Sequence, residues 1–383
     1  MKVTLTSGEK LNNWVSTNFL GLQNKEEFTV AAIKTVRKYG VGACGPAGFY
    51  GSMDVHQELE KKLAQFLQVE EAIVYSQGFM AVASVIPAFS KKGDIIVADD
   101  GCSFAIQTGL EISRSIIYYF RHNDMDDLVR VLEQVELDCR SKKLALSRRF
   151  IAVEGLYAKS GDKCPLPQIL EIKQRYKYRL IMDESLSFGC LGLQGLGITD
   201  YYGIPASTVE IIAGSFSNCL GSSGGFCAGS HAVVDHQRLS SQAYCFSAAL
   251  SPLLAVSATL AMKYVQDHPQ LLSKMQKNLR VFNAFLPRLP PNYSIIGDAD
   301  SPLRFLQLAK RQETLSKETN ILSKIVEEMR SRGHILAMSK YSAREKFIPP
   351  SSIKICLSGG FSEREVETFA SDLIECLSGQ ATD

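Results

Sequence analysis

The stretch GSFSNCLGSSGG, residues 214–225, consists almost entirely of small and polar residues and begins inside an apolar run, VEIIAGSF (209–216). A polar, glycine-rich loop at the end of a buried strand lets backbone N–H groups approach an anion, which is typical of a site for a phosphate-bearing cofactor. We expect such a loop to offer the cofactor one reactive side chain, and the position for it holds Asn218. The stretch therefore predicts a cofactor-binding fold without its nucleophile.

Short apolar runs alternate with helical patterns over the first two thirds of the chain. The runs are continuous and rich in β-branched residues, as in strands that are buried on both faces. The predicted strands are residues 72–76, 94–99, 115–120, 149–155, 179–184 and 209–216. Amphipathic helical patterns lie between them, for example in SMDVHQELEKKLAQFLQ (52–68). The alternation predicts an α/β domain with a mainly parallel sheet.

The pattern changes after about Lys263, where a long helical stretch (264–286) begins. Two further strands are expected within 301–310 and 351–358, with a helix between them that stops at Gly333. A last helix starts at Ser362 with a capping box to Glu365. The sequence thus predicts an N-terminal segment (1–40), a large domain (41–263) and a smaller C-terminal α/β domain (264–383).

Composition excludes several classes of function. Apolar residues make up 45% and charged residues 21% of 383 residues, which is ordinary for a globular protein. The net charge of +2 gives no strong field for binding nucleic acid. The densest basic run, RSKKLALSRR (140–149), is expected to be a solvated helix end and loop. The ten cysteines form no CxxC pair or zinc spacing, and those near glycines, Cys44 among them, are expected to be reduced and mostly buried.

Targeting and membrane signals are weak. The N-terminus, MKVTLTSGEKLNNW, has no apolar region of a signal peptide. Three windows without charged residues, within 72–90, 211–234 and 239–262, approach the length of a membrane span. Each contains more Ser, Gly or Pro than a lipid-facing helix usually carries, so we expect buried strands and helices instead of a transmembrane helix.

Polar or small residues follow the predicted strands at their ends: Gly78 and Phe79, Ser103, Glu154, Asp183, and Ser215 to Asn218. In an open parallel sheet, ligands bind at the carboxyl ends of the strands. These residues therefore predict a cleft with a carboxylate at its floor and with hydroxyl and backbone N–H groups for a phosphate.

Several motifs resemble those of the α-oxoamine synthases, a pyridoxal-phosphate family with the aspartate-aminotransferase fold (fold type I). The resemblance runs almost end to end and rests on long stretches rather than on one glycine motif. They include KYGVGACGPAGFYGSMDVHQELEKKLAQF (38–66), VEGLYAKSGDKCPLP (153–167), MDESLSFGCLGLQGLG (182–197), GSFSNCLGSSGGF (214–226) and DHQRLSSQAYCFSAALSPLLA (235–255).

The resemblance implies roles for four positions. The lysine that carries the cofactor in active relatives falls on Asn218, whose amide nitrogen is not a nucleophile. No lysine occurs from Tyr178 to Met262, so the amine is absent from the whole region. The histidine that stacks on the cofactor ring falls on Ser103, and the histidine of a DxxH motif falls on Leu186. Asp183 matches the carboxylate that binds the pyridine nitrogen; as a residue alone it could equally be a strand-end cap.

Other matches are weaker. Lys354 lies near the family's arginine for the substrate carboxylate, and Ala47 lies where related subunits often have an arginine. We expect His56 to be a hydrogen-bonded helix residue near a subunit contact, and His122 to be structural.

The resemblance also implies a partner, because family members are dimers whose active sites lie at the subunit interface. A chain without the lysine is expected to form a heterodimer with a lysine-bearing paralogue, which would bind pyridoxal 5′-phosphate covalently. Gly78, Phe79, Asp183 and Ser215 would then line a vestigial pocket. The residues expected to reach the partner's site are Tyr244, Phe246, Ser247, Gly45 and Gly48.

The reaction that the resemblance implies for the pair is the condensation of L-serine with palmitoyl-CoA, with loss of carbon dioxide, to the 3-keto long-chain base of sphingolipid synthesis. It also implies a location at the endoplasmic reticulum membrane, on the cytosolic face, and small membrane regulatory subunits as a further class of partner. Relatives carry a membrane segment before the globular domain; this sequence starts about where that domain begins.

Two alternatives stay open at this point. In the first, the chain is a purely regulatory or scaffolding pseudoenzyme that places no residue in the active site. In the second, it is an active homodimeric synthase of the same family, against which Asn218 is the main argument.

Overall fold

The computed structural model describes residues 1–141 and 147–379 and separates them into two units. The larger unit comprises Leu22–Tyr157 and Lys163–His268. The smaller unit comprises Met1–Gly21, Ala158–Asp162 and the residues from Pro269 onward. The division at residues 40 and 263 stays a prediction from the sequence.

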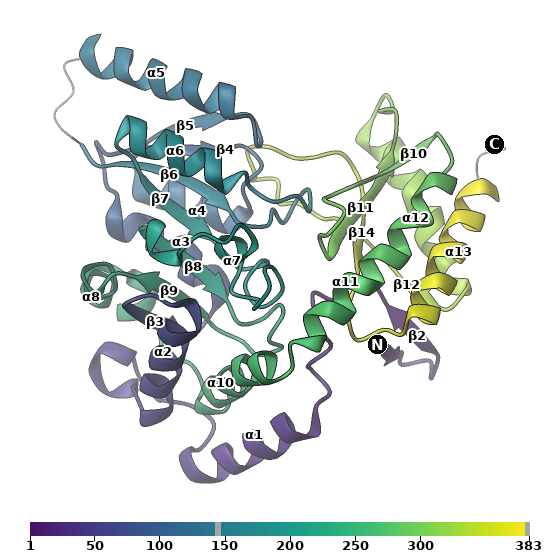
Figure 1. Ribbon diagram of the computed structural model, residues 1–383, viewed down its shortest axis with the longest axis horizontal. Coiled ribbons are helices and arrows are strands. Elements are labelled where there is room, and N and C mark those ends of the chain that lie inside the picture. Colours follow the sequence, from purple (N-terminus) through teal and green to yellow (C-terminus); the bar gives the residue numbers. More distant parts are fainter. Residues whose placement is uncertain (142–146, 380–383) are drawn as a thin grey trace. The chain divides into compact units, whose positions relative to one another are not determined.

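A seven-stranded sheet forms the centre of the larger unit (Figure 1). Its order is β3-β9-β8-β7-β6-β4-β5, and β9 runs antiparallel to both of its neighbours while the other pairs are parallel. The strands are β3 (Glu71–Tyr75), β4 (Ile95–Asp99), β5 (Ile116–Phe120), β6 (Arg149–Glu154), β7 (Arg179–Asp183), β8 (Ile211–Ser215) and β9 (Gly225–Gly229). The predicted mainly parallel sheet is therefore confirmed, and the six predicted strands are β3 to β8.

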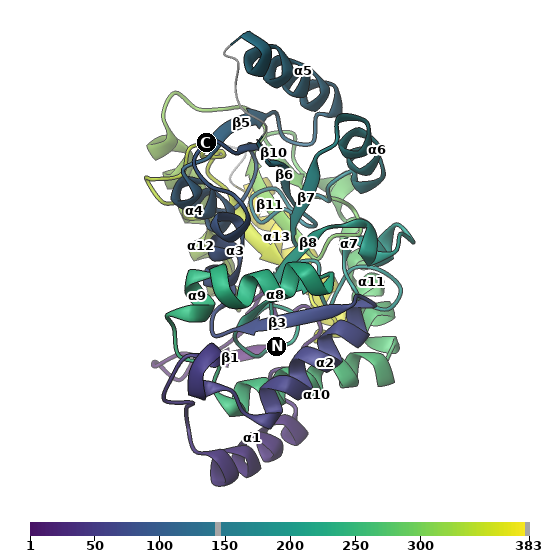
Figure 2. The ribbon, with the colours of Figure 1, turned by 90° about the vertical axis from the view of Figure 1, so that its left-hand side faces the viewer.

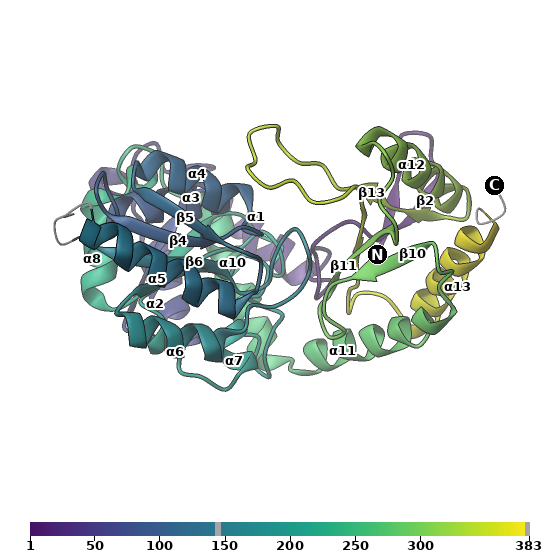
Figure 3. The same cartoon turned by 90° about the horizontal axis from the view of Figure 1, so that it is seen from above.

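Helices cover both faces of this sheet, as the alternating pattern predicts; Figure 3 shows α3 and α4 on one face and α5 and α6 on the other. The helices are α1 (Glu26–Tyr39), η1 (Ala47–Gly51), α2 (Asp54–Leu67), α3 (Gly78–Phe89), α4 (Phe104–Ser113), α5 (Met125–Ser141), α6 (Leu166–Tyr176), α7 (Ile198–Tyr201), η2 (Ala206–Thr208), α8 (His231–Ser240), α9 (Gln242–Cys245) and α10 (Pro252–Asp267).

Strand β9 was not expected, because GFCAG has two glycines and no β-branched residue. Its glycines allow a helix to pack closely. A Cβ added at Gly225 would lie 2.6 Å from the Cβ of Ala81 and 2.7 Å from the Cα of Gly78, both in α3. Close packing of α3 on β9 thus requires glycine, and the same glycines explain why the sequence pattern did not predict this strand.

The smaller unit contains two sheets. One has the order β1-β2-β12 and the other β10-β11-β14-β13. The strands are β1 (Lys2–Thr4), β2 (Lys10–Asn13), β10 (Tyr293–Ile296), β11 (Leu303–Leu308), β12 (His334–Ile335), β13 (Ala337–Met338) and β14 (Ile353–Cys356). The helices are α11 (Gln270–Asn283), η3 (Leu286–Arg288), α12 (Leu315–Ser331) and α13 (Glu363–Gly379).

The core of the smaller unit is built on Trp14, which is fully buried and stacks on Phe361 and Phe369 with ring centroids 3.9 and 4.1 Å apart. The indole N–H donates to Nδ1 of His334 at 3.0 Å. Trp14 therefore satisfies its polar group within the core, as a buried indole must.

Of two helix boundaries predicted from the sequence, one is wrong and one is confirmed. The expected helix over 264–286 is two helices, because Pro269 lacks an N–H group and α10 ends before it while α11 begins after it. The capping box is confirmed: Ser362 N–H and Oγ both donate to Glu365, and Glu365 N–H donates to Ser362 Oγ at 3.3 Å.

The structure tests three further expectations, which concern the cysteines, the basic run and membrane-spanning helices. Of the cysteines near glycines, Cys102, Cys190, Cys219 and Cys227 are buried as expected, but Cys44 is exposed. In the basic run, Arg140 lies in α5 and Arg149 begins β6, whereas residues 142–146 lie outside the described residues. Within residues 1–141 and 147–379, no helix is both long enough and apolar enough to span a membrane.

Candidate functional site

The residues predicted for the cofactor cleft lie at one edge of the large sheet. Parallel strands β4, β6, β7 and β8 end at this edge, and β3, which is antiparallel to β9, ends there too. Ser103 is the N-cap residue of α4, Asp183 ends β7, and Ser215 ends β8. The fold therefore brings residues from well-separated parts of the sequence to one place.

The loops after β3 and β8 touch directly. A Cβ added at Gly78 would lie 2.3 Å from Oγ of Ser215 and 2.6 Å from its Cβ, so only glycine fits at the start of α3. Ser215 Oγ lies within hydrogen-bond distance of two acceptors for its single hydrogen, Ser217 Oγ (3.0 Å) and Gly224 O (3.3 Å), and it accepts from Ser217 N–H at 3.1 Å. Phe79 is 44% exposed, with its ring 6.0 Å from that of Phe104.

Asn218 is held by the loop after β7. Its Nδ2 donates to the carbonyl oxygen of Ser185 at 2.6 Å. The position where the sequence predicts the family's lysine thus holds an amide that is bonded to the main chain two residues after Asp183. The side chain is fixed but has no electron pair free to attack a carbonyl.

Ser103, Glu154 and Asp183 form the floor of this edge. Glu154 and Asp183 are register partners on β6 and β7 and are 2% and 5% exposed. The N–H of Ser103 donates to Glu154, whereas Ser103 Oγ is buried without a hydrogen-bond partner among the described residues. Asp183 Oδ1 accepts from Ser185 N–H at 2.8 Å. Burial raises the pKa of Asp183 to about 6.

Glu184 is a buried carboxylate that the sequence did not single out. It accepts hydrogen bonds from Ser187 Oγ and from Ile198 N–H (3.1 Å), and burial raises its pKa to about 7. A Cβ at Gly155 or Gly197 would lie within 2.7 Å of its Oε2, so those glycines make room for it. Leu186 is 9% exposed and packs as a core residue in the same turn.

The two segments predicted to border a partner's site pack against each other. Gly45 O accepts from Ala249 N–H at 2.9 Å, and Pro46 forms an antiparallel bridge with Ala248. A Cβ at Gly48 would lie 3.5 Å from the ring of Tyr244. Residues 45–51 and 244–249, about 200 positions apart in sequence, therefore form one surface.

Aromatic side chains stand exposed on this surface. Phe49, Tyr50 and Phe246 are 76%, 73% and 83% exposed. We call these three residues the aromatic patch. Tyr244, by contrast, is buried, and Ser247 Oγ lies 3.1 Å from Ser76 Oγ, directly after β3. Exposed apolar residues gathered in one patch are unusual on a chain that stays alone and typical of an interface.

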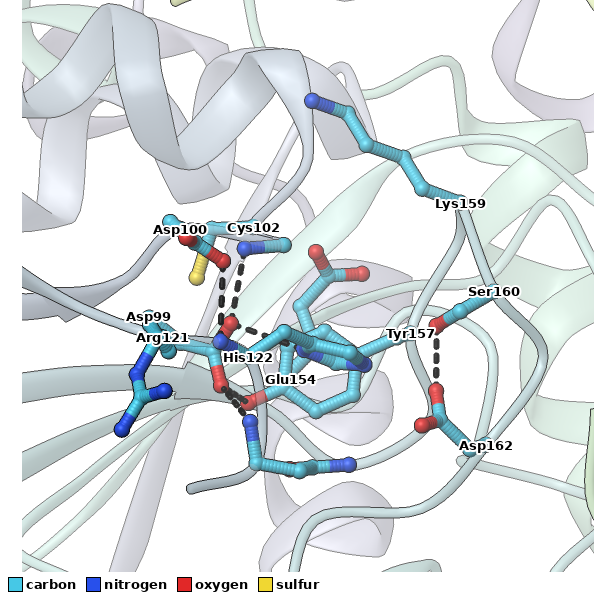
Figure 4. Close-up of polar contacts among 12 residues, drawn as sticks. Asp99, Asp100, Cys102, Arg121, His122, Glu154, Tyr157, Lys159, Ser160 and Asp162 are labelled. Carbon is cyan, nitrogen blue, oxygen red and sulfur yellow. Dashed lines mark hydrogen bonds and ion pairs between the residues drawn. The ribbon is translucent and has the colours of Figure 1, made fainter. Parts of the chain in front are cut away.

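His122 belongs to a polar cluster around Asp99, which is fully buried at the end of β4 (Figure 4). Its Nδ1 lies 2.8 Å from Asp99 Oδ1, and Tyr157 OH donates to Asp99 Oδ2 at 2.9 Å. The N–H groups of Gly101 and Asn123 also donate to this carboxylate. These contacts saturate Asp99 and fix the turn before Ser103, which agrees with a structural role for His122.

His56 is bonded on both ring nitrogens. Nδ1 accepts from Met53 N–H at 3.0 Å, so Nε2 carries the hydrogen and donates to Leu250 O at 2.6 Å. Burial lowers its pKa. The expected hydrogen-bonded helix residue is confirmed, and its nearness to a subunit contact stays a prediction. Lys354 lies in β14 of the smaller unit, and Ala47 begins η1.

These residues do not fit a covalently attached cofactor. Asn218 offers no amine, and residues 178–262 contain no lysine. Asp183 would offer a carboxylate to a pyridine nitrogen, as the resemblance implies, but Ser103, at the position expected for a stacking ring, offers only a hydroxyl whose Oγ has no partner among the described residues.

Comparison with known proteins gives concordant matches. The family model "Aminotransferase class I and II" matches residues 9–373. The chain is 43% identical to serine palmitoyltransferase 1 of Dictyostelium discoideum over 97% of this chain and 78% of that protein. It is 40% identical to long chain base biosynthesis protein 1b of Oryza sativa subsp. japonica over 95% of this chain and 75% of that protein.

Among solved structures, a serine palmitoyltransferase variant from S. paucimobilis with bound PLP and myriocin matches with a TM-score of 0.88 and 20% identity, covering 100% of this chain and 91% of the other. At this level of identity the likeness shows the fold, which is the aspartate-aminotransferase-like fold expected from the sequence.

Proposed function

The chain belongs to the class I and II aminotransferase family and, within it, to the serine palmitoyltransferase subunit 1 group, and from this premise we propose that it is the subunit without the cofactor lysine. It acts in sphingolipid biosynthesis as a partner of a lysine-bearing paralogue. The pair condenses L-serine with palmitoyl-CoA to 3-ketosphinganine and carbon dioxide. The observation that carries the proposal is Asn218, an amide bonded to Ser185 O at the position of the nucleophile.

Pyridoxal 5′-phosphate, bound covalently by the paralogue, would supply the electron sink for the condensation. This chain contributes surface and shape rather than covalent chemistry. The aromatic patch is its contact with the paralogue, because three exposed aromatic side chains would gain by burial there. Tyr244 and the backbone of Gly45 and Gly48 support the patch from below.

Ser247 is the residue proposed to reach the paralogue's cofactor phosphate. Its hydroxyl is partly buried and lies 3.1 Å from Ser76 Oγ, so it is already oriented. A hydroxyl held in this way donates a hydrogen bond to an anion with little further loss of side-chain entropy. We propose the endoplasmic reticulum membrane, at its cytosolic face, as the place of action and small membrane subunits as regulators, both from the family.

The test is to locate the covalently bound cofactor. The chain alone, the paralogue alone and the co-produced pair are incubated with pyridoxal phosphate and reduced with borohydride, and the labelled peptide is identified by mass spectrometry. We expect no label on this chain and one label per pair, on the paralogue. A label on this chain would overturn the proposal and favour an active homodimer.

Kinetic measurements on the assembled pair distinguish the scaffolding alternative from a role in the active site. Ser247→Ala removes the hydroxyl but leaves the aromatic patch, so assembly should persist. A changed KM or kcat, or an altered acyl-chain preference, supports a role in the active site. Unchanged kinetics with intact assembly would mean that this chain only scaffolds its partner.

A further inference from the structure

A basic pocket lies at the opposite edge of the large sheet, where β4, β6 and β7 begin. Figure 2 looks onto this end of the unit, with α8 in front and α5 and α6 above it. The pocket has a volume of about 800 Å³ and is lined by seven basic and two acidic side chains, together with Ser147 and Tyr176. The basic residues are Lys91, Arg140, Arg148, Arg149, Arg175, Lys177 and Arg179. We call it the basic pocket.

The two acidic side chains of the basic pocket are already engaged. Asp94 accepts hydrogen bonds from the backbone N–H groups of Lys91 (3.0 Å) and Arg148 (2.8 Å). Glu136 pairs with Arg149. Within the described part of the chain, the side chains of Arg140, Arg175, Lys177 and Arg179 form no ion pair, and all four are exposed. The pocket therefore carries a local excess of positive charge on a chain whose net charge is only +2.

An apolar groove adjoins the basic pocket and shares Arg148 and Arg179 with it. Its volume is about 460 Å³, within the range of roughly 300–1,000 Å³ that ligand pockets span. Seven of its fifteen lining residues are apolar: Val69, Phe89, Phe150, Val209, Ile211, Ala232 and Val233. We call it the apolar groove.

Glu210, Glu70 and His236, which also line the groove, each form a polar contact. Glu210 is neutralised by Lys173 at 2.7 Å and accepts from Leu180 N–H. Glu70 accepts from His231 N–H at the start of α8, and His236 Nε2 lies 2.8 Å from Ala88 O. The unpaired guanidinium of Arg179 is thus the outstanding polar group that the two cavities share; that of Arg148 already donates to Phe89 O at 2.8 Å.

We propose that the two cavities together bind a single-chain lipid phosphate, with its phosphate group at Arg148 and Arg179 and its hydrocarbon chain in the apolar groove. Guanidinium groups bind phosphate with paired, charge-assisted hydrogen bonds, and an aliphatic lining favours an alkyl chain over a polar one. A nucleotide fits less well, because Phe89, an aromatic side chain that lines the groove, already packs on His236 with ring centroids 4.9 Å apart. This site lies at the opposite strand ends from Asn218 and does not depend on the proposed function.

The first test uses dodecyl phosphate as the probe, kept below its micelle concentration, with the purified chain and isothermal titration calorimetry. We expect saturable binding that weakens with added salt. Inorganic phosphate should bind at least tenfold more weakly, because it leaves the groove empty. Adenosine 3′,5′-bisphosphate should also bind more weakly than dodecyl phosphate. Equal binding of all three probes would mean a general anion site and would overturn the lipid assignment.

Matched variants locate the site. Arg179→Glu should weaken dodecyl phosphate binding about tenfold or more, whereas Lys92→Glu, the same charge change at an exposed lysine outside both cavities, should leave it unchanged. Ala232→Trp fills the apolar groove from α8 and should weaken dodecyl phosphate but not inorganic phosphate. Thermal unfolding of each variant checks that it is folded.

A membrane surface is the competing occupant. Phosphatidylcholine vesicles with and without phosphatidic acid are sedimented with the same variants. Binding to the acidic vesicles in the absence of any affinity for monomeric dodecyl phosphate would contradict the proposal and assign the basic pocket to a bilayer. Equal effects of Arg179→Glu and Lys92→Glu would contradict it as well.

Discussion

At the scale of single residues, Asn218 decides what this chain can do. The amide is fixed by its 2.6 Å hydrogen bond to Ser185 O, close to the Asp183 carboxylate. We predict that Asn218→Lys, in the chain alone, gains borohydride-dependent labelling by pyridoxal phosphate at position 218. It should not gain condensation activity, because Ser103 cannot stack on a ring and Leu186 cannot exchange a proton.

Asn218→Met is the matched control, since it fills similar space without an amine. Mass spectrometry of the labelled peptides reads out the result. Labelling of the two variants to the same extent would mean that the label comes from another lysine and that position 218 does not face the cofactor pocket.

The two buried carboxylates predict how stability depends on pH. Burial raises the pKa of Asp183 from 3.8 to about 6 and that of Glu184 from 4.5 to about 7. The folded chain therefore keeps protons that the unfolded chain has lost, so the free energy of unfolding contributed by these groups falls as pH rises from about 4 to 7. For Asp183 alone the loss is roughly 3 kcal/mol at most.

Asp183→Asn removes the ionisation while its side-chain oxygen still accepts from Ser185 N–H. We expect a smaller decrease in stability between pH 4 and 7 in urea denaturation, and a more stable protein than the wild type at pH 8. Asp235→Asn, at an exposed position in α8, should keep the wild-type dependence. An unchanged pH dependence in Asp183→Asn would show that Asp183 is ionised in the folded chain.

The sequence predicts the location of some of the site residues but not of others. Ser103, Asp183, Ser215 and Asn218 could be assigned to one edge because each follows a recognisable strand and parallel strands end together. Glu184 could not, because its burial depends on long-range contacts with Gly155 and Gly197 that no local pattern records.

At the scale of elements, the contact between α3 and the end of β8 is the tightest constraint on the cleft. We predict that Gly78→Ala destabilises the fold by about 1–3 kcal/mol, because the added Cβ would lie 2.6 Å from the Cβ of Ser215, which cannot move without the strand. Gly42→Ala is the control: no atom lies within 4 Å of the added Cβ, and its cost should be near zero. Urea denaturation measures both, and equal stabilities would mean that α3 shifts without cost.

The helices and strands are largely predictable where the sequence keeps one pattern of apolar residues over the whole element. The six strands β3 to β8 follow from continuous β-branched runs, and the start of α13 follows from its capping box. Strand β9 and the break at Pro269 are the exceptions. The first depends on how closely α3 packs, and the second on one proline whose effect overrides the amphipathic pattern on both sides of it.

At the scale of the whole molecule, the large unit uses the two edges of its sheet differently. The edge with Asn218 offers an amide where the sequence predicts the family's lysine, and it carries the buried carboxylates and the adjacent aromatic patch. Carboxyl groups whose pKa is raised by burial lower the free energy of unfolding near neutral pH, and exposed aromatic side chains reduce solubility. The presence of both agrees with a surface that is completed by another chain.

We therefore predict that Phe246→Asp prevents assembly with the lysine-bearing paralogue without unfolding this chain. Phe246 is 83% exposed, so an aspartate there costs the isolated chain little, whereas in an interface it buries an unpaired charge. An anchoring aromatic residue contributes about 2 kcal/mol or more, so Kd should rise roughly 30-fold or more. Leu137→Asp, on α5 at a 59% exposed position, is the control and should leave assembly intact.

Co-purification and size-exclusion chromatography of the tagged pair measure the effect, with thermal unfolding of the isolated chain as the check on folding. Should Phe246→Asp assemble as well as Leu137→Asp, the aromatic patch is not the contact with the paralogue. The patch would then have to bind a different partner, and the proposed reach of Ser247 into the paralogue's site would fail with it, because both lie on the same surface of residues 244–249.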